Sequence, residues 1–255
     1  MNVQLRYLPV PRGTIAALDY EPRRPRGIAV AVAHGYSSSK HNLDVLCAFL
    51  ASHGFSVLSV DFPGHKLGAS GGVLSSIDDL TDTLTAAARY AREHYSETVY
   101  TCGHSMGATT ALRVCAGDPQ VAGAIAIATG WGRPSALDAL ATKGVVDLRG
   151  GYVNGLGLPE IVAATEPLLE GVLSRLGGRP CLYVAAERDM MVSQRSVAEL
   201  FARAPEPKTF ETIPSDHTYA GEHARAAVLA WLGALHPREG QRPRAEPVSA
   251  ASDPL

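Results

Sequence analysis

The chain alternates between short apolar segments and segments with helical spacing, and this alternation narrows its fold more than any other feature. Eight segments have the length and composition of strands: residues 3–8, 14–19, 27–33, 55–60, 97–102, 121–128, 180–186 and 208–213. Five have helical spacing: residues 42–53, 77–93, 108–116, 194–203 and 222–235. The first two strands surround Pro and Gly residues and predict an antiparallel hairpin. The remainder predicts an α/β fold, with a mostly parallel sheet of about eight strands and helices on both faces.

One strand-to-helix junction carries a chemical signature. Residues 103–107 read GHSMG, directly after the strand-like segment 97–102 and directly before the helix-forming segment 108–116. The pattern G-x-S-x-G in this context places a serine on a sharp, strained turn with its hydroxyl exposed above the sheet. Glycines two residues before and after the serine allow the strand and the helix to approach closely. The junction therefore predicts that Ser105 is a nucleophile.

Bulk properties exclude several classes of protein. The 255 residues are 46% hydrophobic and carry a formal net charge of -2. This balance gives no basic footprint for nucleic acid. No apolar run reaches the roughly 18 to 20 residues that span a bilayer, and the first residues lack the pattern of a secretory signal. We expect a cytoplasmic protein without a membrane span or a nucleic-acid partner.

The cysteines and histidines suggest no metal chemistry. Cys47, Cys102, Cys115 and Cys181 all lie in apolar segments without C-x-x-C spacing, which is typical of buried thiols in a reducing compartment. His41 and His65 have no partners at the spacing of a metal site. We therefore expect neither a metal nor a cofactor.

Two stretches interrupt the alternation. Residues 131–178 lie between two predicted core strands and are rich in glycine, which favours a small inserted cap or lid over a simple helical connection. Residues 236–255 contain many Pro, Arg, Glu, Ser and Ala residues and almost no large apolar ones, which predicts a disordered tail. Residues 1–235 would then form one core domain that carries the cap.

With these motifs in place, the chain resembles the α/β-hydrolase superfamily of serine hydrolases over residues 1–235. Residues 34–39, HGYSSS, are similar to the H-G-aromatic-small loop of bacterial carboxylesterases and feruloyl-esterase-like enzymes. Residues 61–70, DFPGHKLGAS, resemble their D-x-x-G-H-G-x-S segment, although Lys66 and Leu67 make the loop longer here. The resemblance implies the α/β-hydrolase fold and a nucleophile–acid–histidine order along the chain.

That order suggests the partners of Ser105. His217 lies in a polar loop after a predicted strand, where the family carries its catalytic histidine, and would serve as the base. Asp189 follows another buried strand and would orient the imidazole, with Glu187 as the alternative acid. Asp216 is adjacent to the histidine in sequence and therefore poorly placed to meet the same ring.

The resemblance also implies an oxyanion hole, formed by the backbone N–H groups of Tyr36 and Met106. His34 is expected to brace the loop that carries Tyr36, and His104 to pack below the nucleophile. Asp61 follows the strand before the nucleophile strand, which is not the family's position for the acid, so we expect a structural role.

The expected reaction is hydrolysis of small to medium carboxylic esters through an acyl-enzyme. Trp131, Tyr152 and Leu156 in the predicted cap are candidate substrate-binding residues, and Leu158, Ile161 and Val162 are expected to extend an apolar wall beside them. The same segment holds one arginine, Arg149. Thioesterase, peptidase and acyltransferase reactions would use the same triad, as would perhydrolysis or C–C bond cleavage. A non-catalytic ligand-binding protein on the same fold is the alternative from another class.

Overall fold

The computed structural model describes residues 1–132 and 145–237 and contains the predicted sheet. Its eight strands lie in the order β1-β2-β4-β3-β5-β6-β7-β8. The first two pair antiparallel with each other, β2 pairs antiparallel with β4, and all other pairs are parallel. The strands are β1 (Asn2–Val10), β2 (Gly13–Glu21), β3 (Ala29–Ala33), β4 (Ser56–Val60), β5 (Val99–His104), β6 (Val121–Ile127), β7 (Cys181–Ala186) and β8 (Lys208–Ile213). The predicted hairpin and mostly parallel sheet are confirmed.

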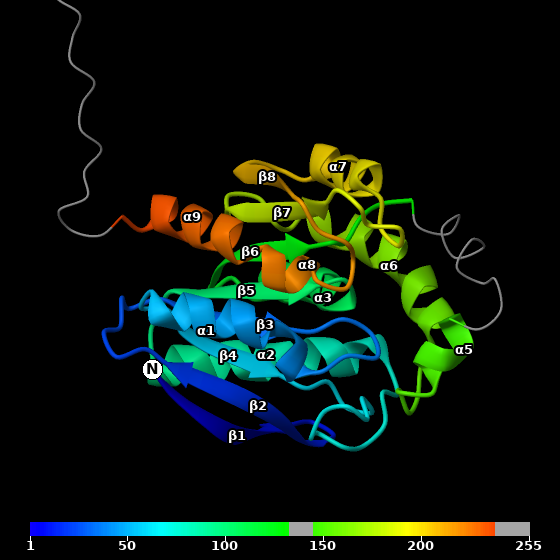
Figure 1. The fold of residues 1–255 in the computed structure, drawn as a ribbon, viewed down its shortest axis with the longest axis horizontal. Helices are drawn as coiled ribbons and strands as arrows, with labels where there is room; N and C mark the ends of the chain where they lie inside the picture. The colour runs from blue at the N-terminus through cyan, green and yellow to red at the C-terminus, as the bar shows by residue number, and fades with distance from the viewer. Residues whose placement is uncertain (133–144, 238–255) are drawn as a thin grey trace, which may run out of the picture.

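Helices cover both faces of this sheet (Figure 1). One face packs against α1 (Asp44–Ser52), α8 (Ala220–His223) and α9 (Arg225–Leu235). The other packs against α2 (Ile77–His94), α3 (Met106–Gly117), α6 (Leu158–Leu173) and α7 (Gln194–Arg203). A short helix, α5 (Val145–Gly150), precedes α6, and a 3-10 turn (Lys40–Leu43) precedes α1.

The central strand β3 shows why the sequence forms a two-faced core. All five of its residues are buried. Ala29, Ala31 and Ala33 belong to the apolar cluster on one face, and Val30 and Val32 belong to the cluster on the other. Successive side chains of a strand point to opposite faces, so a strand between two helical layers needs an unbroken apolar run. The small alanines on one face allow α2 and α3 to approach closely.

The carboxyl ends of the parallel strands gather the loops that carry the candidate site residues. The strand β3 leads into residues 34–39, β5 into Ser105, β7 into the loop with Asp189, and β8 into the loop with His217. Parallel strands end at one edge of a sheet, and ligands of open α/β sheets bind beyond that edge. The topology alone therefore brings together residues that are far apart in sequence.

The described part of the 131–178 segment contains two helices, α5 and α6, that the sequence pattern did not predict. Helix α6 packs against α3, and its Leu169 is fully buried. Residues 133–144 of the predicted cap and 238–255 of the predicted tail lie outside the described residues. His236, the first residue of the predicted tail, is hydrogen-bonded to Tyr100: its Nε2 lies 2.8 Å from the tyrosine hydroxyl oxygen. No helix in the described ranges has the length and apolarity to cross a bilayer.

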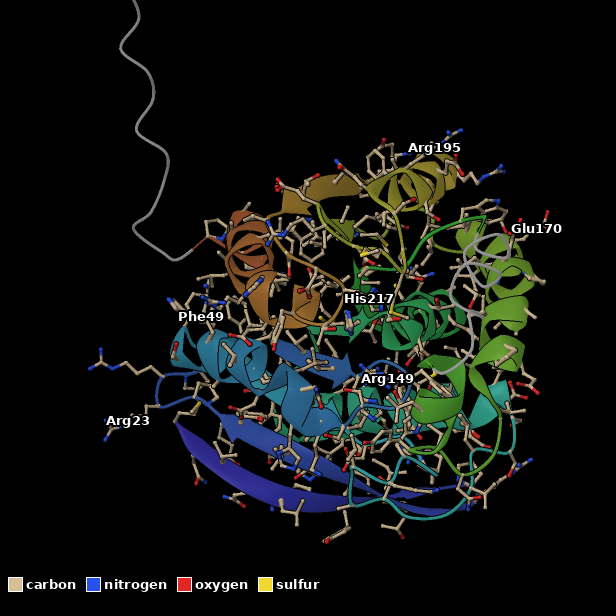
Figure 2. All side chains as sticks on the ribbon, turned by 45° about the vertical axis from the view of Figure 1, so that its right-hand side comes forward. Arg23, Phe49, Arg149, Glu170, Arg195 and His217 are labelled. Carbon is tan, nitrogen blue, oxygen red and sulfur yellow. The ribbon has the colours of Figure 1, made fainter. Side chains whose placement is uncertain are left out.

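Truncation of Leu169 will test whether α6 belongs to the folded core. Leu169→Ala removes a fully buried side chain and should lower the free energy of unfolding by about 2–4 kcal/mol, measured by urea denaturation. Glu170→Ala, one residue further along the same helix and exposed (Figure 2), is the matched control and should change it by less than about 0.5 kcal/mol. Equal small effects of the two substitutions would show that α6 is only loosely attached.

Candidate active site

The turn at Ser105 has the strained backbone that the motif predicts. Ser105 has φ +55° and ψ −116°, a conformation that non-glycine residues rarely adopt, and it immediately precedes α3. A Cβ atom at Gly103 would lie 2.1 Å from the carbonyl oxygen of Gly107, and one at Gly107 would lie 2.3 Å from that of Ala33. Both glycines are therefore required by close backbone approach, and the hydroxyl of Ser105 is held at the top of the sheet.

Ser105, His217 and Asp189 form a hydrogen-bonded chain. The Nδ1 atom of His217 lies 2.7 Å from Oδ2 of Asp189, and its Nε2 lies 3.1 Å from Oγ of Ser105. A carboxylate only accepts hydrogen bonds, so Nδ1 carries the proton of the neutral ring and Nε2 is left to accept from the serine hydroxyl. The Asp189 side chain is fully buried, while that of His217 is 12% exposed. This arrangement suits a serine whose proton is removed by the imidazole.

Local hydrogen bonds hold the candidate acid and the loop of the candidate base in place. The second carboxylate oxygen of Asp189, Oδ1, accepts the backbone N–H groups of Met191 at 2.8 Å and Val192 at 2.7 Å, which closes the turn after β7. The alternative acid, Glu187, is exposed. The carboxylate of Asp216 accepts the N–H of Tyr219 at 3.0 Å and so stabilises the loop after β8.

The two predicted oxyanion-hole residues both flank Ser105. Met106 is the first residue of α3, so its N–H belongs to the donors that the helix itself cannot pair. Tyr36 lines the same cavity as Ser105. Gly35, immediately before it, abuts the turn: a Cβ atom there would lie 3.3 Å from Cβ of Ser105. The phenol of Tyr36 donates to the carbonyl oxygen of Leu156 at 3.2 Å, which ties the loop to the segment before α6.

His34 braces this loop from below as a neutral ring. Its Nε2 accepts the backbone N–H of Phe62 at 3.1 Å, so the proton sits on Nδ1, which donates to the carbonyl oxygen of Gly35 at 2.7 Å. Complete burial, with a smaller contribution from His65, lowers the pKa of His34 to about 3. The ring is therefore uncharged near neutral pH and links residues 34–36 to the loop after β4.

Asp61 organises the loop after β4 through a buried ion pair. Its carboxylate accepts hydrogen bonds from Nζ of Lys40 at 2.5 Å and from the backbone N–H groups of Lys40 at 2.8 Å and Ala69 at 2.7 Å. The side chains of Asp61 and Lys40 are 0% and 2% exposed. Burial alone would raise the pKa of Asp61, but the hydrogen bonds from Lys40 and Ala69 outweigh it and lower that pKa. The structural role expected for Asp61 matches this geometry.

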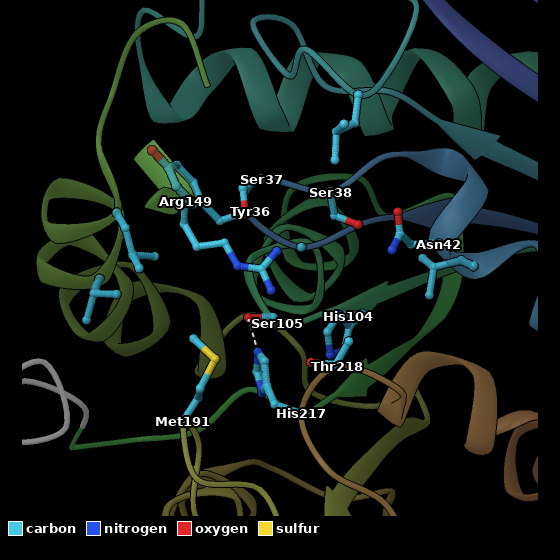
Figure 3. A pocket seen from close by; sticks show the side chains of 15 residues that line it. Tyr36, Ser37, Ser38, Asn42, His104, Ser105, Arg149, Met191, His217 and Thr218 are labelled. Carbon is cyan, nitrogen blue, oxygen red and sulfur yellow. Dashed lines mark hydrogen bonds between the residues drawn. The ribbon is translucent and has the colours of Figure 1, made fainter. Parts of the chain in front are cut away.

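A cavity of about 130 Å³ opens above Ser105 (Figure 3). Its described walls contain both apolar and polar residues, with one permanently charged side chain, Arg149. The apolar residues are Leu43, Leu67, Leu158, Val162 and Met191. The remaining residues are Gly35, Tyr36, Ser37, Ser38, Asn42, His104, Ser105, His217 and Thr218. His104, expected below the nucleophile, lies beside His217 with ring centroids 4.9 Å apart.

The three residues predicted to bind substrate are not among the described residues that line this cavity. The ring of Trp131 is covered by the guanidinium of Arg203, 4.4 Å from its centroid. Tyr152 is 39% exposed, and its carbonyl oxygen accepts the N–H of Lys66. Leu156 packs against the core. Of the apolar wall predicted from the same segment, Leu158 and Val162 do line the cavity.

Some of the lining residues could have been suspected from the sequence. Met191 and Thr218 follow Asp189 and His217 closely, so the loops that carry the candidate acid and base also supply walls of the cavity. Leu67 belongs to the two residues that lengthen the loop at 61–70. Nothing in the sequence indicates that Leu67 and Leu158 meet at one cavity, because that contact depends on how the 131–178 segment crosses the sheet.

Comparisons with known proteins agree with this fold. The Hydrolase_4 family model, serine aminopeptidase, S33, matches residues 23–160, which include Ser105 and end before Asp189 and His217. Among curated proteins, none matches the chain.

Solved structures resemble the protein over most of its length. The esterase domain of a Rhodothermus marinus protein has a TM-score of 0.68 and 25% identity, covering 92% of this chain and 98% of that one. The Pyrococcus furiosus esterase Pf2001 has a TM-score of 0.68 at 19% identity, covering 92% and 90%. The α/β hydrolase GrgF from Penicillium sp. sh18 has a TM-score of 0.69 at 18% identity, covering 92% and 98%. At such identities the last two show the fold alone.

Asp61→Asn will test the buried ion pair. The substitution leaves the Lys40 ammonium buried without its counter-charge and should lower the free energy of unfolding at pH 7 by about 3 kcal/mol. The pKa of Asp61 is lowered in the folded protein, so its stabilisation is complete above the ordinary value of 3.8 and is lost as the pH falls through the lower, folded value. The difference between wild type and variant should therefore shrink in acid.

Urea denaturation at pH 7 and at about pH 3 measures both effects. Asp78→Asn is the matched control, because Asp78 pairs with Arg113 at the surface and its side chain is 72% exposed. Asp78→Asn should lower the free energy of unfolding by less than about 1 kcal/mol. A loss at Asp61 no larger than that at Asp78 would contradict the bracing role.

Proposed function

The chain belongs to the Hydrolase_4 family (serine aminopeptidase, S33) of α/β-hydrolases, and we propose that it hydrolyses small to medium carboxylic esters with Ser105 as nucleophile. The observation that carries the proposal is the hydrogen-bonded chain from Ser105 through His217 to Asp189 beneath an open cavity. The esterase domain from Rhodothermus marinus, which resembles the protein over almost its entire length, supports esters as the substrate class.

In the acylation step, the Oγ atom of Ser105 attacks the ester carbonyl carbon while Nε2 of His217 takes the hydroxyl proton. The buried Asp189 stabilises the imidazolium that forms. The negative charge that develops on the carbonyl oxygen would be held by the N–H groups of Tyr36 and Met106. When the tetrahedral intermediate collapses, the C–O bond breaks and the leaving alkoxide takes the proton from His217.

In the deacylation step, water replaces the alcohol. His217 removes a proton from the water, whose oxygen attacks the acyl carbon on Ser105. Collapse of the second tetrahedral intermediate releases the carboxylic acid and returns the proton to Oγ of Ser105. All atoms come from the ester and water, so the cycle requires no further reactant.

The cavity favours an ester over a peptide with a free amino terminus. An aminopeptidase needs acidic groups to bind the α-ammonium of its substrate. The described residues that line the cavity include no Asp or Glu, and their one permanent charge is the cation Arg149. An ammonium group would be repelled there. The volume of about 130 Å³ lies below the roughly 300–1,000 Å³ typical of sites for drug-sized ligands and favours short acyl chains.

A chain-length series will test the proposal. p-Nitrophenyl esters from acetate to palmitate, assayed with the wild type beside Ser105→Ala, should show turnover that peaks at short or medium chains. Ser105→Ala should reduce turnover to background and abolish covalent labelling by a fluorophosphonate, because no other described side chain combines the strained turn with a hydrogen bond to His217.

Three outcomes would contradict the proposal in different ways. Labelling that persists at another residue in Ser105→Ala would overturn the nucleophile. A labelled Ser105 without turnover of any ester would point to thioesters, peptides or acyl transfer. A wild type that neither reacts with the probe nor turns over esters would favour a non-catalytic ligand-binding role.

Substitution of the acid will test the triad separately. Asp189→Asn keeps the hydrogen bonds to residues 191 and 192 but favours the wrong tautomer of His217, and it should lower kcat by about 10⁴. Glu187→Gln, in the same loop and exposed, is the matched control and should leave kcat within about twofold. A larger loss at Glu187 would show that the acid is misassigned.

A further inference from the structure

The active-site cavity contains a charge that ester hydrolysis does not require. Arg149, on α5, lines the cavity together with Ser105 and His217. In Figure 3 its guanidinium points toward Ser105 from the side opposite to His217. A neutral ester has no anionic group that would need a full positive charge beside the reacting carbonyl. The side chain therefore indicates something about the substrate.

The guanidinium of Arg149 is not used by its described neighbours. None of the ion pairs or side-chain hydrogen bonds among the described residues involves it. The side chain is exposed at the cavity mouth and so retains water while the site is empty. A guanidinium is always charged, is weakly hydrated and presents paired donors that match a carboxylate. An arginine that none of the described residues pairs is suited, in this position, to an anionic group that arrives with the substrate.

The segment that carries Arg149 is held to the loop after β4, so the backbone from which the guanidinium projects has a defined position. The carbonyl oxygens of Gly151 and Tyr152 accept Nζ and the backbone N–H of Lys66 at 2.8 and 2.9 Å. The backbone N–H of Asn154 donates to the carbonyl oxygen of Gly64, and the carbonyl oxygen of Asn154 accepts the N–H of Leu74, each at 2.8 Å. The N–H of Tyr152 also bonds the carbonyl oxygen of Arg149 itself at 3.1 Å. Because these contacts already order the backbone of the segment, less conformational entropy is lost when a ligand binds.

The surrounding walls define the rest of the ligand. Leu158, Val162 and Met191 offer an apolar surface, and no carboxylate among the described lining residues competes for the guanidinium. A suitable substrate therefore has a scissile ester, a short apolar spacer and an anionic end.

We propose that Arg149 is a specificity-determining residue that binds a free carboxylate on the substrate, so that the preferred esters also carry a carboxylate. The proposal rests on the ester hydrolysis proposed above and names its substrate class. The simplest such compounds are monoesters of short dicarboxylic acids, in which the carboxylate lies on the acyl side. Esters of hydroxy acids place it on the alcohol side.

Matched ester pairs will test this assignment. Monomethyl glutarate differs from methyl pentanoate only in its terminal carboxylate, and 3-(pentanoyloxy)propanoate differs from propyl pentanoate in the same way. Titration of the released acid gives kcat/KM for each, and the ratio of charged to neutral ester isolates the effect of the carboxylate. The wild type should favour the charged member of at least one pair, which identifies the side on which the carboxylate lies.

Substitutions at Arg149 should lower this ratio, and by more as the side chain becomes less positive. Arg149→Gln should lower it about tenfold or more, Arg149→Lys by less, and Arg149→Glu by more than Arg149→Gln. Because the side chain is exposed, added salt should lower the ratio for the wild type but not for Arg149→Gln. Arg23→Gln is the matched control: Arg23 extends into solvent far from the site (Figure 2), and the ratio should stay at the wild-type value.

A binding measurement separates this proposal from the proposed function. Glutarate should raise the Tm of the wild type and of Arg23→Gln, but not that of Arg149→Gln. A glutarate shift without any Ser105-dependent ester turnover would support the carboxylate site and overturn ester hydrolysis. An unchanged ratio in Arg149→Gln for both pairs, including the case in which kcat/KM falls equally for charged and neutral esters, would overturn the assignment of Arg149.

Discussion

The close approach of α3 to the end of β3 is the constraint on which the rest of the site depends. Gly107 contacts the backbone of Ala33 so closely that no side chain could intervene, and Gly103 contacts Gly107 in the same way. This contact forces the turn at Ser105 into its strained conformation. It also brings residues 34–36, which continue from β3, alongside the serine. The proposed nucleophile and the candidate oxyanion donors are thus positioned by close packing between backbone atoms.

Buried hydrogen bonds connect the loops around this contact. Asp61 and Lys40 form a buried pair that shapes the loop after β4, and the neutral ring of His34 joins that loop to residues 34–36. Buried polar groups are costly unless every partner is present. Such a network specifies one arrangement more sharply than apolar contacts, because a displaced loop would leave donors and acceptors unpaired. Precision at Ser105 is therefore supplied by groups that never touch the reacting atoms.

The sequence contains most of the information about the core and less about the cavity. The strands were predictable because each is a short apolar run between turns, and the turn at Ser105 because its glycines are required by backbone contacts. Helix α6 was missed, since glycines and prolines around Leu158 obscure its apolar spacing. The meeting of Ser105, Asp189 and His217 follows from the shared edge of the sheet. The walls do not: Leu67, Arg149 and Leu158 meet only through the path of the inserted segment.

The backbone hydrogen bonds between residues 64–74 and 151–156 have a consequence for recombination of this protein with its relatives. The two stretches bond at His65–Val153 and Leu74–Gly155, and a Cβ atom at Gly155 would collide with the carbonyl oxygen of Leu74. A chimera that imports one stretch without the other would lose this pairing. Together they constitute one exchangeable module: the connection between α5 and α6 and the loop after β4 must be inherited, or engineered, as a pair.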